Sequence, residues 1–252
     1  MPVFFLSPEC VTPPTISITG DLVVHLRNSL RTKVGEIVVF GDGAGHRYRA
    51  EITELTKGTM TGRILEVMDR PTDHSPSVTL AQAVLKGEKM DWVIQKATEL
   101  GVTCIIPLQT QNTIVQLRPE RIEAQLARWQ RIALEAAQQS EQWHMATIAP
   151  PQTLETLLSA QAPRTMALIL AERQEGGSLQ TVELLTDAAD SVIVIIGPEG
   201  GWTNEEVARA KEAGYRPITL GQQILRADTA AIATISIIQS RLGKLGSIGF
   251  TG

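Results

Sequence analysis

The sequence of 252 residues has little cysteine, few aromatic side chains and no long apolar run. Its two cysteines, Cys10 and Cys104, lie far apart and have no metal-ligating neighbours, so neither a disulfide framework nor a zinc site is indicated. Apolar runs such as Val192–Ile196 are far shorter than the roughly 20 residues of a membrane-spanning helix. The stretch Met1–Leu6 lacks the basic region of a secretory signal peptide. We therefore expect a cytoplasmic protein.

The chain also lacks an excess of positive charge. Its net charge is −4 and its isoelectric point is near 5.7, which is the wrong sign for a protein that coats nucleic acid without preference. Residues 21–50 depart from this balance, with five basic residues against three acidic ones. This local bias is equally consistent with a nucleic-acid contact and with an ordinary solvated surface.

Several well-known catalytic motifs are missing. The sequence has no phosphate-binding G-x-x-x-x-G-K-[ST] loop, no G-x-S-x-G nucleophile elbow and no H-E-x-x-H zinc helix. Its four histidines are scattered, which does not favour a metal site. The run Gly41–Gly45 is similar to a dinucleotide-binding loop, but it lies between two short strand patterns. It is therefore expected to be a hairpin turn.

Residues 1–70 show the pattern of a small β-barrel-like domain. Short apolar or alternating runs, including Glu36–Phe40 and Tyr48–Ile52, are separated by glycine-rich turns. One helix is expected at Asp21–Leu30, because leucines recur there at helical spacing after a possible N-cap. These leucines are Leu22, Leu26 and Leu30.

A polar segment with two prolines, residues 71–77, is expected to link this domain to a second one at 78–252. There the apolar spacing predicts helices at Lys89–Leu100, capped by Gly101, and at Pro119–Ser140. Strands are predicted at Val78–Leu85, Thr103–Leu108, Thr165–Ala171, Ser191–Ile196 and Pro217–Leu220. Alternating strands and helices indicate an α/β domain with a mainly parallel sheet.

Ligands of open α/β sheets bind at the carboxyl ends of the strands, which draws attention to the run Gly197–Gly201 after a predicted strand. Its glycines allow close approach of backbone to a ligand, and Pro198 stiffens the turn. Thr203 and Glu206 have the spacing of a capping box, so a helix is predicted to begin there. A tight strand-to-helix connection without a ligand is the alternative.

A second candidate loop runs from Leu220 to Ala230, again between a predicted strand and an apolar helix. Ile224 and Leu225 could pack on an adenine ring, with Arg226 beside them. Asp228 could simply cap the helix, which needs no catalytic explanation.

Taken together, the strings I-G-P-E-G-G-W-T-N-E-E and L-G-Q-Q-I-L-R-A-D-T-A resemble the cofactor motifs of the SPOUT methyltransferases. The chain is similar in particular to the bacterial family that methylates N3 of a uridine in 16S ribosomal RNA. The similarity continues over nearly the whole chain, at His25–Leu26 with Leu30–Arg31, Lys86–Gly87, Gln95–Val102 and Ala136–Ser140.

This resemblance implies a PUA-like β-barrel for RNA in residues 1–70 and an α/β domain with a C-terminal trefoil knot in residues 78–252. It also implies a homodimer, ribosomal RNA of the small subunit as partner and substrate, and S-adenosylmethionine as cofactor, with no metal. The implied cofactor contacts are Leu170, Gly197, Pro198, Glu199, Gly200, Leu220, Gly221, Ile224 and Leu225.

Methyl transfer to N3 of uridine requires loss of the N3 proton, so the site must favour deprotonation. We expect Asp228 to be the base and Arg226 to steady the oxyanion that develops on the uracil ring; both could instead be structural. The basic residues of the barrel domain are expected to contact RNA phosphates. These are Arg27, Arg31, Lys33, Arg47 and Arg49.

The chain departs from the family pattern at four positions. Val24 replaces the first of two histidines, Asn112 and Gln142 replace arginines, and Asp228 replaces a glutamate. An amide does not reproduce the bidentate fork of arginine, so these changes bear on the substrate. A different uridine, a different RNA, weakened activity, a non-catalytic RNA-binding or ribosome-assembly protein, and a small-molecule methyltransferase stay open as alternatives.

Overall fold

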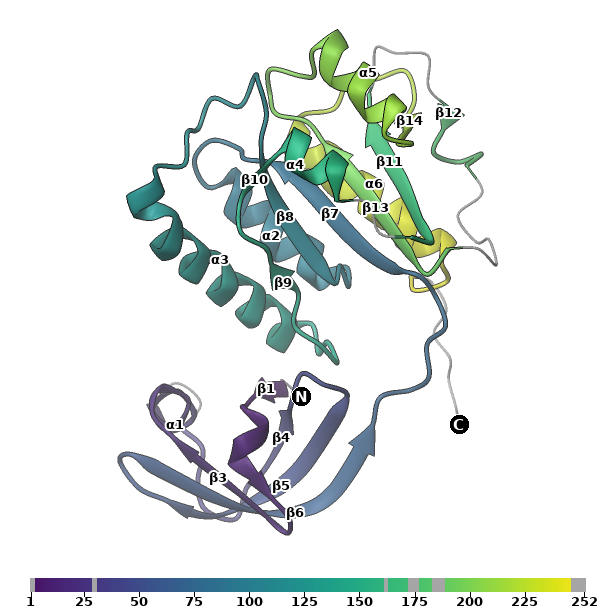
Figure 1. Ribbon diagram of the computed structural model, residues 1–252. Helices are drawn as coiled ribbons and strands as arrows, with labels where there is room; N and C mark the ends of the chain where they lie inside the picture. The colour runs from purple at the N-terminus through teal and green to yellow at the C-terminus, as the bar shows by residue number, and fades with distance from the viewer. Residues whose placement is uncertain (1–2, 29–30, 161–162, 172–176, 183–188, 246–252) are drawn as a thin grey trace. The chain divides into compact units, whose positions relative to one another are not determined.

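The computed structural model describes residues 3–28, 31–160, 163–171, 177–182 and 189–245 of the chain. These residues belong to two compact units (Figure 1). The first unit consists of Met1–Asp73 together with Ala137–Met145, and the second of His74–Ala136 together with Ala146–Gly252. Residues 70–76 form neither helix nor strand.

The first unit is built on a six-stranded sheet with the order β1-β4-β5-β6-β3-β2. Only β1 and β4 run parallel, and every other neighbouring pair is antiparallel. The strands are β1 (Val3–Phe5), β2 (Val11–Thr12), β3 (Thr15–Thr19), β4 (Ile37–Gly41), β5 (His46–Leu55) and β6 (Thr59–Asp69). A 3-10 helix, η1 (Pro8–Cys10), and one α-helix, α1 (Asp21–Asn28), complete the unit.

The helix expected at Asp21–Leu30 is confirmed as α1. Val23 and Leu26 are fully buried, Leu22 is partly buried against the same core, and Leu30 lies outside the described residues. The leucine spacing thus predicted the helix, but it did not single out Val23 as a core residue. The core that α1 joins also contains Ile16 and Phe40.

The run Gly41–Gly45 forms the predicted hairpin turn between β4 and β5. One carboxylate oxygen of Asp42 accepts hydrogen bonds from the backbone N–H groups of Ala44, Gly45 and His46. The other oxygen lies 2.8 Å from Nδ1 of His46. This turn is therefore fixed by its own side chain, as short aspartate turns commonly are.

Residues 137–145, which follow most of helix α3, pack with the first unit rather than the second. The guanidinium of Arg47 donates to the carbonyl oxygen of Glu141 and lies 3.8 Å from the ring centre of Trp143. A methyl side chain at Gly43 would meet Cε of Met145 at 3.5 Å. The spacing that predicted a helix over Pro119–Ser140 carried no sign of this association.

The second unit is an α/β structure around a parallel sheet, as predicted. The strand order is β10-β8-β7-β13-β11-β14-β12, and β9 pairs with β8. The strands are β7 (Ser77–Ala83), β8 (Cys104–Gln109), β9 (Thr147–Ile148), β10 (Gln152–Thr153), β11 (Thr165–Leu170), β12 (Gly177–Ser178), β13 (Ser191–Ile196) and β14 (Arg216–Thr219).

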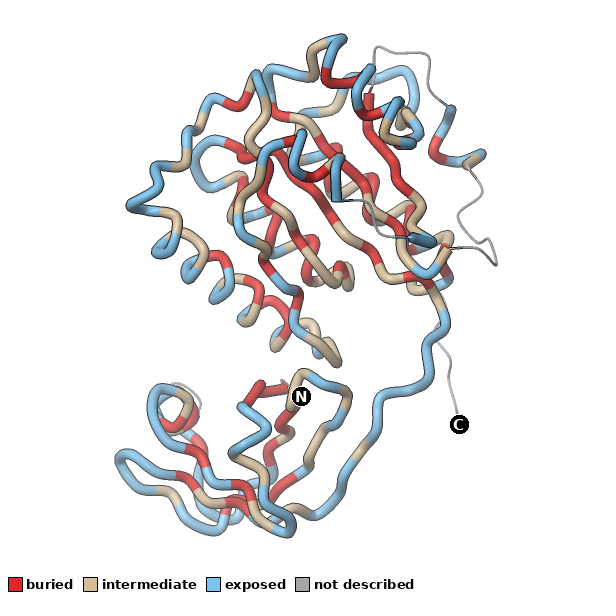
Figure 2. Tube along the Cα trace, viewed as in Figure 1, coloured by how far each residue is buried: buried red, intermediate tan, exposed pale blue. Residues whose placement is uncertain are grey.

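Helices cover both faces of this sheet. They are α2 (Lys89–Glu99), α3 (Pro119–Gln139), α4 (Leu154–Ser159), α5 (Asn204–Glu212) and α6 (Ala227–Arg241). One face packs against α2, α3 and α6 and the other against α4 and α5. The central strands β7, β13 and β11 are accordingly buried along most of their length (Figure 2). Their continuous apolar sequences are typical of parallel strands covered on both sides.

None of the described helices is long and apolar enough to cross a membrane. Because all strands of the second sheet are parallel, the loops that follow β7, β8, β11, β13 and β14 emerge at the same edge. Both candidate loops of the sequence are among them. The trefoil knot stays a prediction.

Candidate functional site

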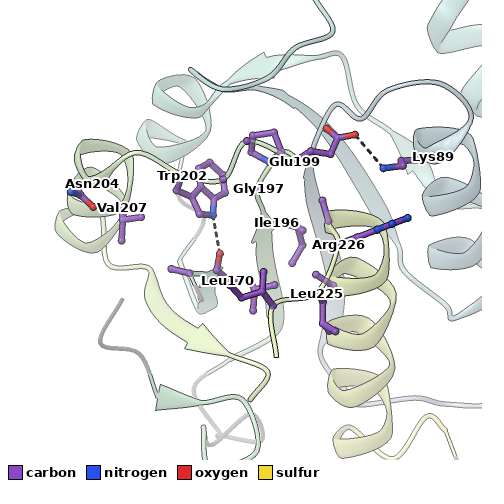
Figure 3. A pocket seen from close by; sticks show the side chains of 17 residues that line it. Lys89, Leu170, Ile196, Gly197, Glu199, Trp202, Asn204, Val207, Leu225 and Arg226 are labelled. Carbon is purple, nitrogen blue, oxygen red and sulfur yellow. Dashed lines mark hydrogen bonds and ion pairs between the residues drawn. The ribbon is translucent and has the colours of Figure 1, made fainter. Parts of the chain in front are cut away.

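A cavity of about 780 Å³ lies at the carboxyl ends of β11 and β13 and beside the start of α6 (Figure 3). Its described lining comes from the ends of β11 and β13, the glycine-rich turn after β13, the start of α5, the residues before α6 with the first turn of that helix, and the first turn of α2. The lining residues are Lys89, Leu170, Ala171, Ile196, Gly197, Pro198, Glu199, Gly200, Gly201, Trp202, Asn204, Val207, Ile224, Leu225, Arg226, Ala227 and Ala230. The two candidate loops therefore meet in one cavity.

The glycine-rich turn after β13 is shaped by the indole of Trp202. Nε1 of Trp202 donates a 2.8 Å hydrogen bond to the carbonyl oxygen of Leu170 at the end of β11. A Cβ added at Gly197 would lie only 3.0 Å from Cε2 and Nε1 of the same indole. A side chain at residue 197 would therefore require the indole or the turn to shift by a few tenths of an ångström.

The predicted capping box at the start of α5 is confirmed. Oγ1 of Thr203 accepts from the N–H of Glu206 at 3.1 Å, and the carboxylate of Glu206 accepts from the N–H of Thr203 at 2.9 Å. Glu206 is 5% exposed, and its second oxygen accepts from the N–H of Gln111 at 2.9 Å. The buried charge is therefore satisfied, and the end of the glycine-rich turn is held in place.

One ion pair lies at the edge of the cavity. The carboxylate of Glu199 lies 3.6 Å from Nζ of Lys89, and it accepts a 3.3 Å hydrogen bond from the backbone N–H of Lys86 (Figure 3). The helix α2 is thereby tied to the glycine-rich turn. Arg226 contributes a second cation to the described lining.

The helix α6 begins one residue after Arg226, which occupies the N-cap position without a capping side-chain bond. Asp228 lies in the first turn of the helix, so the alternative that Asp228 is its N-cap is wrong. Oδ1 of Asp228 is buried and has no hydrogen-bond partner among the described residues. An unpaired buried carboxylate oxygen is costly, so this side chain needs an explanation beyond helix capping.

All of the expected cofactor contacts except Leu220 and Gly221 line the cavity, and so does Arg226. Leu220, Gly221 and Asp228 do not appear in its described lining. The sequence reasoning did not anticipate the contributions of Lys89, Trp202, Asn204 and Val207. Trp202 follows Gly201 directly and Asn204 lies three residues after it, so closeness in the sequence was the available signal for both. Lys89 had none, because it comes from a distant helix.

The five basic residues of the first unit differ in their surroundings. Arg31 and Lys33 are exposed, and Arg27 is partly exposed. Nε of Arg49 lies 3.1 Å from a carboxylate oxygen of Glu66. Arg47 contacts the carbonyl oxygen of Glu141 and the ring of Trp143. Burial lowers the pKa of its guanidinium.

Within the described part of the chain, no group of three or more histidine, cysteine, aspartate or glutamate residues has an arrangement that could hold a metal ion.

Comparison with known proteins identifies both units. Residues 73–239 match the model of the RNA methyltransferase domain, and residues 18–65 match that of the RNA methyltransferase PUA domain.

Two curated relatives are ribosomal RNA small subunit methyltransferases E. The one from Synechocystis is 33% identical over 94% of this chain and 77% of its own length, and the one from Bacillus subtilis is 29% identical over 89% and 90%. A solved structure of the Neisseria gonorrhoeae ribosomal RNA small subunit methyltransferase E, bound to S-adenosyl methionine, superposes with a TM-score of 0.86. It is 32% identical and covers 96% of this chain and 98% of that one. On these matches, the chain belongs to the RNA methyltransferase family, with a PUA domain in its first unit and the methyltransferase domain in its second.

Proposed function

We propose that this protein transfers a methyl group from S-adenosylmethionine to N3 of a uridine in 16S ribosomal RNA of the small subunit. The observation that carries the proposal is the cavity between the glycine-rich turn and the start of α6, in a chain that is similar over almost its full length to a methyltransferase bound to this cofactor.

The residues that line the cavity fit S-adenosylmethionine. The volume of about 780 Å³ lies within the range of small-molecule sites. Leu170, Ile196 and Leu225 offer apolar packing for an adenine ring, and the backbone of Gly197–Gly201 offers polar groups at close approach. When bound, the cofactor supplies a methyl group on a positively charged sulfonium.

The proton of uridine N3 is the chemical obstacle to this reaction, and two residues of the chain suit it. Asp228 has a buried carboxylate oxygen without a described partner, so it can accept that proton. The guanidinium of Arg226 lines the cavity and can stabilise the negative charge that deprotonation leaves on the uracil oxygens. We assign Asp228 as the base and Arg226 as the electrostatic stabiliser.

For RNA, we propose that the PUA domain supplies phosphate contacts through Arg27, Arg31 and Lys33. Arg47 and Arg49 remain candidates that would first have to give up the contacts with Trp143 and Glu66. The target uridine must leave any base stack to reach the methyltransferase cavity, which favours single-stranded or splayed RNA. The protein would then act in the cytoplasm, with ribosomal RNA.

We further propose a homodimer, supported by helix α6. Ile232, Ala233 and Ile237 of this helix are only partly buried in the single chain. Apolar side chains that stay accessible together mark a surface that another protein can cover. A second copy of the chain would cover these residues. We also propose the trefoil knot that the family resemblance implies for the second unit.

The experiment combines methyl transfer with identification of the product. Purified protein is incubated with labelled S-adenosylmethionine and either free 16S ribosomal RNA or small subunits that lack the modification, and the product is analysed by nucleoside mass spectrometry. N3-methyluridine is the expected product. Asp228→Asn is expected to slow single-turnover transfer by roughly 10²-fold or more while cofactor affinity is kept.

Other outcomes separate the alternatives. Transfer by Asp228→Asn at the wild-type rate would remove Asp228 from the role of base. A methylated nucleoside other than N3-methyluridine would point to a different target. Cofactor binding without transfer to either RNA would favour a non-catalytic RNA-binding or ribosome-assembly protein.

A further inference from the structure

The loop that follows β8, Thr110–Thr113, contacts the glycine-rich turn that follows β13. These strands are not neighbours in the sheet, because β7 lies between them. Nδ2 of Asn112 nevertheless donates to the carbonyl oxygen of Gly201 at 3.0 Å and points to that of Gly200 at 3.4 Å. One side chain thus joins two loops that are 88 residues apart in the sequence and that follow strands which are not neighbours in the sheet.

The contact is close as well as polar. A Cβ built on Gly200 would lie 2.9 Å from Cβ of Asn112 and 3.2 Å from its carbonyl oxygen. Gly201 next to it has a φ of 71°, in the left-handed region. The backbone of the turn therefore lies directly against Asn112, and both glycines are needed for this approach.

A second attachment holds the same two loops together. The backbone N–H of Gln111 donates to the carboxylate of Glu206, whose other oxygen accepts from the N–H of Thr203. Gln111 and Asn112 thus hold the segment Gly200–Thr203 from both ends.

The loop of Asn112 is held in place by its own hydrogen bonds. The hydroxyls of Thr110 and Thr113 lie 2.7 Å apart, and the N–H of Thr110 donates to Oγ1 of Thr113 at 3.0 Å. Thr113 is 4% exposed, and its carbonyl oxygen accepts from the side chain of Gln116 at 3.3 Å. A loop fixed in this way can restrict two consecutive glycines, which have more accessible backbone conformations than other residues.

We propose that Asn112 is a positioning residue for the cofactor, which acts by holding the carbonyl groups of Gly200 and Gly201 in the binding conformation. This inference rests on the proposed function, because Gly200 and Gly201 line the cavity whereas Asn112 does not. Without the amide, the turn samples more conformations in the free protein. Cofactor binding then costs more conformational entropy, so the affinity for the cofactor falls.

The first test measures S-adenosylmethionine affinity by calorimetry. Asn112→Ala removes the amide, and Asn112→Asp replaces the donor by a carboxylate that faces two carbonyl oxygens. We expect affinity to fall by roughly 10-fold in Asn112→Ala and by more in Asn112→Asp. Gln111→Ala is the matched control, since Gln111 contacts Glu206 through its backbone only, and it should bind as wild type does.

Two further measurements separate positioning from a general loss of structure. The two carbonyl oxygens that face residue 112 disfavour a carboxylate and so raise the pKa of the aspartate in Asn112→Asp above its ordinary value of about 3.9. A protonated carboxyl can donate a hydrogen bond, so the affinity ratio of wild type to Asn112→Asp should shrink from about pH 8 to about pH 5, while that of Asn112→Ala stays constant. In the protein without cofactor, hydrogen exchange in residues 198–206 should be faster in Asn112→Ala than in Gln111→Ala.

The outcomes distinguish this inference from the proposed function. Affinities within twofold of wild type for both Asn112 variants, or unchanged hydrogen exchange in residues 198–206, would overturn the positioning role. If the wild-type protein binds the cofactor but methylates no RNA, the proposed function fails, whereas the positioning role still stands or falls on the affinities and the exchange rates.

Discussion

Replacing Gly197 by alanine tests the central feature of the cavity, which is the close packing of the glycine-rich turn on Trp202. A Cβ at residue 197 would lie 3.0 Å from two indole atoms and 3.4 Å from a third. The indole cannot move away freely, because its Nε1 is bonded to the carbonyl oxygen of Leu170 at 2.8 Å (Figure 3). The added methyl group must therefore either strain the turn or break this bond.

The expected cost follows from these two effects. Overpacking by one methyl group costs about 1–3 kcal/mol, and loss of a neutral hydrogen bond about 1 kcal/mol. Since one of these effects suffices to relieve the overlap, the cost of about 1–3 kcal/mol corresponds to a decrease of roughly 2–12 °C in the Tm of the methyltransferase unit. Because Gly197 lines the cavity, affinity for S-adenosylmethionine should fall at least roughly 10-fold as well.

Calorimetric unfolding and cofactor titration of Gly197→Ala measure both quantities. Gly58→Ala is the matched control, because a Cβ at residue 58 meets nothing within 4 Å and its backbone is not in the left-handed region. If Gly197→Ala had the same Tm and cofactor affinity as Gly58→Ala, the packing of Trp202 on the turn would not be a determinant of the site.

Three other predictions concern ionisation and RNA. Burial raises the pKa of Tyr215 to about 12, so its contribution to stability should be complete below its ordinary pKa of 10.0 and lost as the pH rises towards 12; ultraviolet titration of wild type and Tyr215→Phe measures this. For Asp42, burial raises the pKa, but hydrogen bonds from the backbone of His46 and Ala44 and from the His46 side chain outweigh it. The net pKa is lowered below 3.8, so this residue should stabilise the PUA domain above that pH and lose its effect under more acidic conditions, which acid unfolding of wild type and Asp42→Asn would detect. Arg31→Ala should reduce the slope of the salt dependence of single-stranded RNA binding by about 0.7, whereas Arg47→Ala should leave the slope unchanged because Arg47 is engaged with Trp143; equal slopes in the two variants would contradict this distinction.

The features that could be predicted from the sequence are those encoded locally. The strand before Gly197 is apolar from Val192 to its end, the turn carries its own glycines, and the capping box of Thr203 and Glu206 marks the start of α5 within a few residues. Each signal lies within one segment, so periodicity and turn chemistry were sufficient. Hence both candidate loops were identified, and the cavity joins them.

Contacts between distant segments could not be predicted in this way. Nothing near Lys89 in the sequence indicates that it pairs with Glu199, and nothing near Asn112 indicates the carbonyl groups that it contacts. The resemblance to the family suggested only that residue 112 was unusual. The same holds for residues 137–145, because the contacts of Arg47 with that segment depend on the folded chain.

The buried Oδ1 of Asp228 has no described hydrogen-bond partner, which bears on the function of this residue. Other buried acceptors in the methyltransferase unit also lack a described partner, among them Oε1 of Gln82 and Oε1 of Gln239, so an orphan atom alone does not mark a catalytic residue. A neutral amide oxygen costs less to leave unpaired than a carboxylate, however, and each of those two glutamines uses its NH₂ group in a hydrogen bond to a backbone carbonyl. Asp228 is separated by a single residue from Arg226, which lines the cavity. Local rules of stability are broken most often where function requires it, which makes Asp228, rather than either glutamine, the residue whose substitution should slow transfer by roughly 10²-fold or more while the fold is kept.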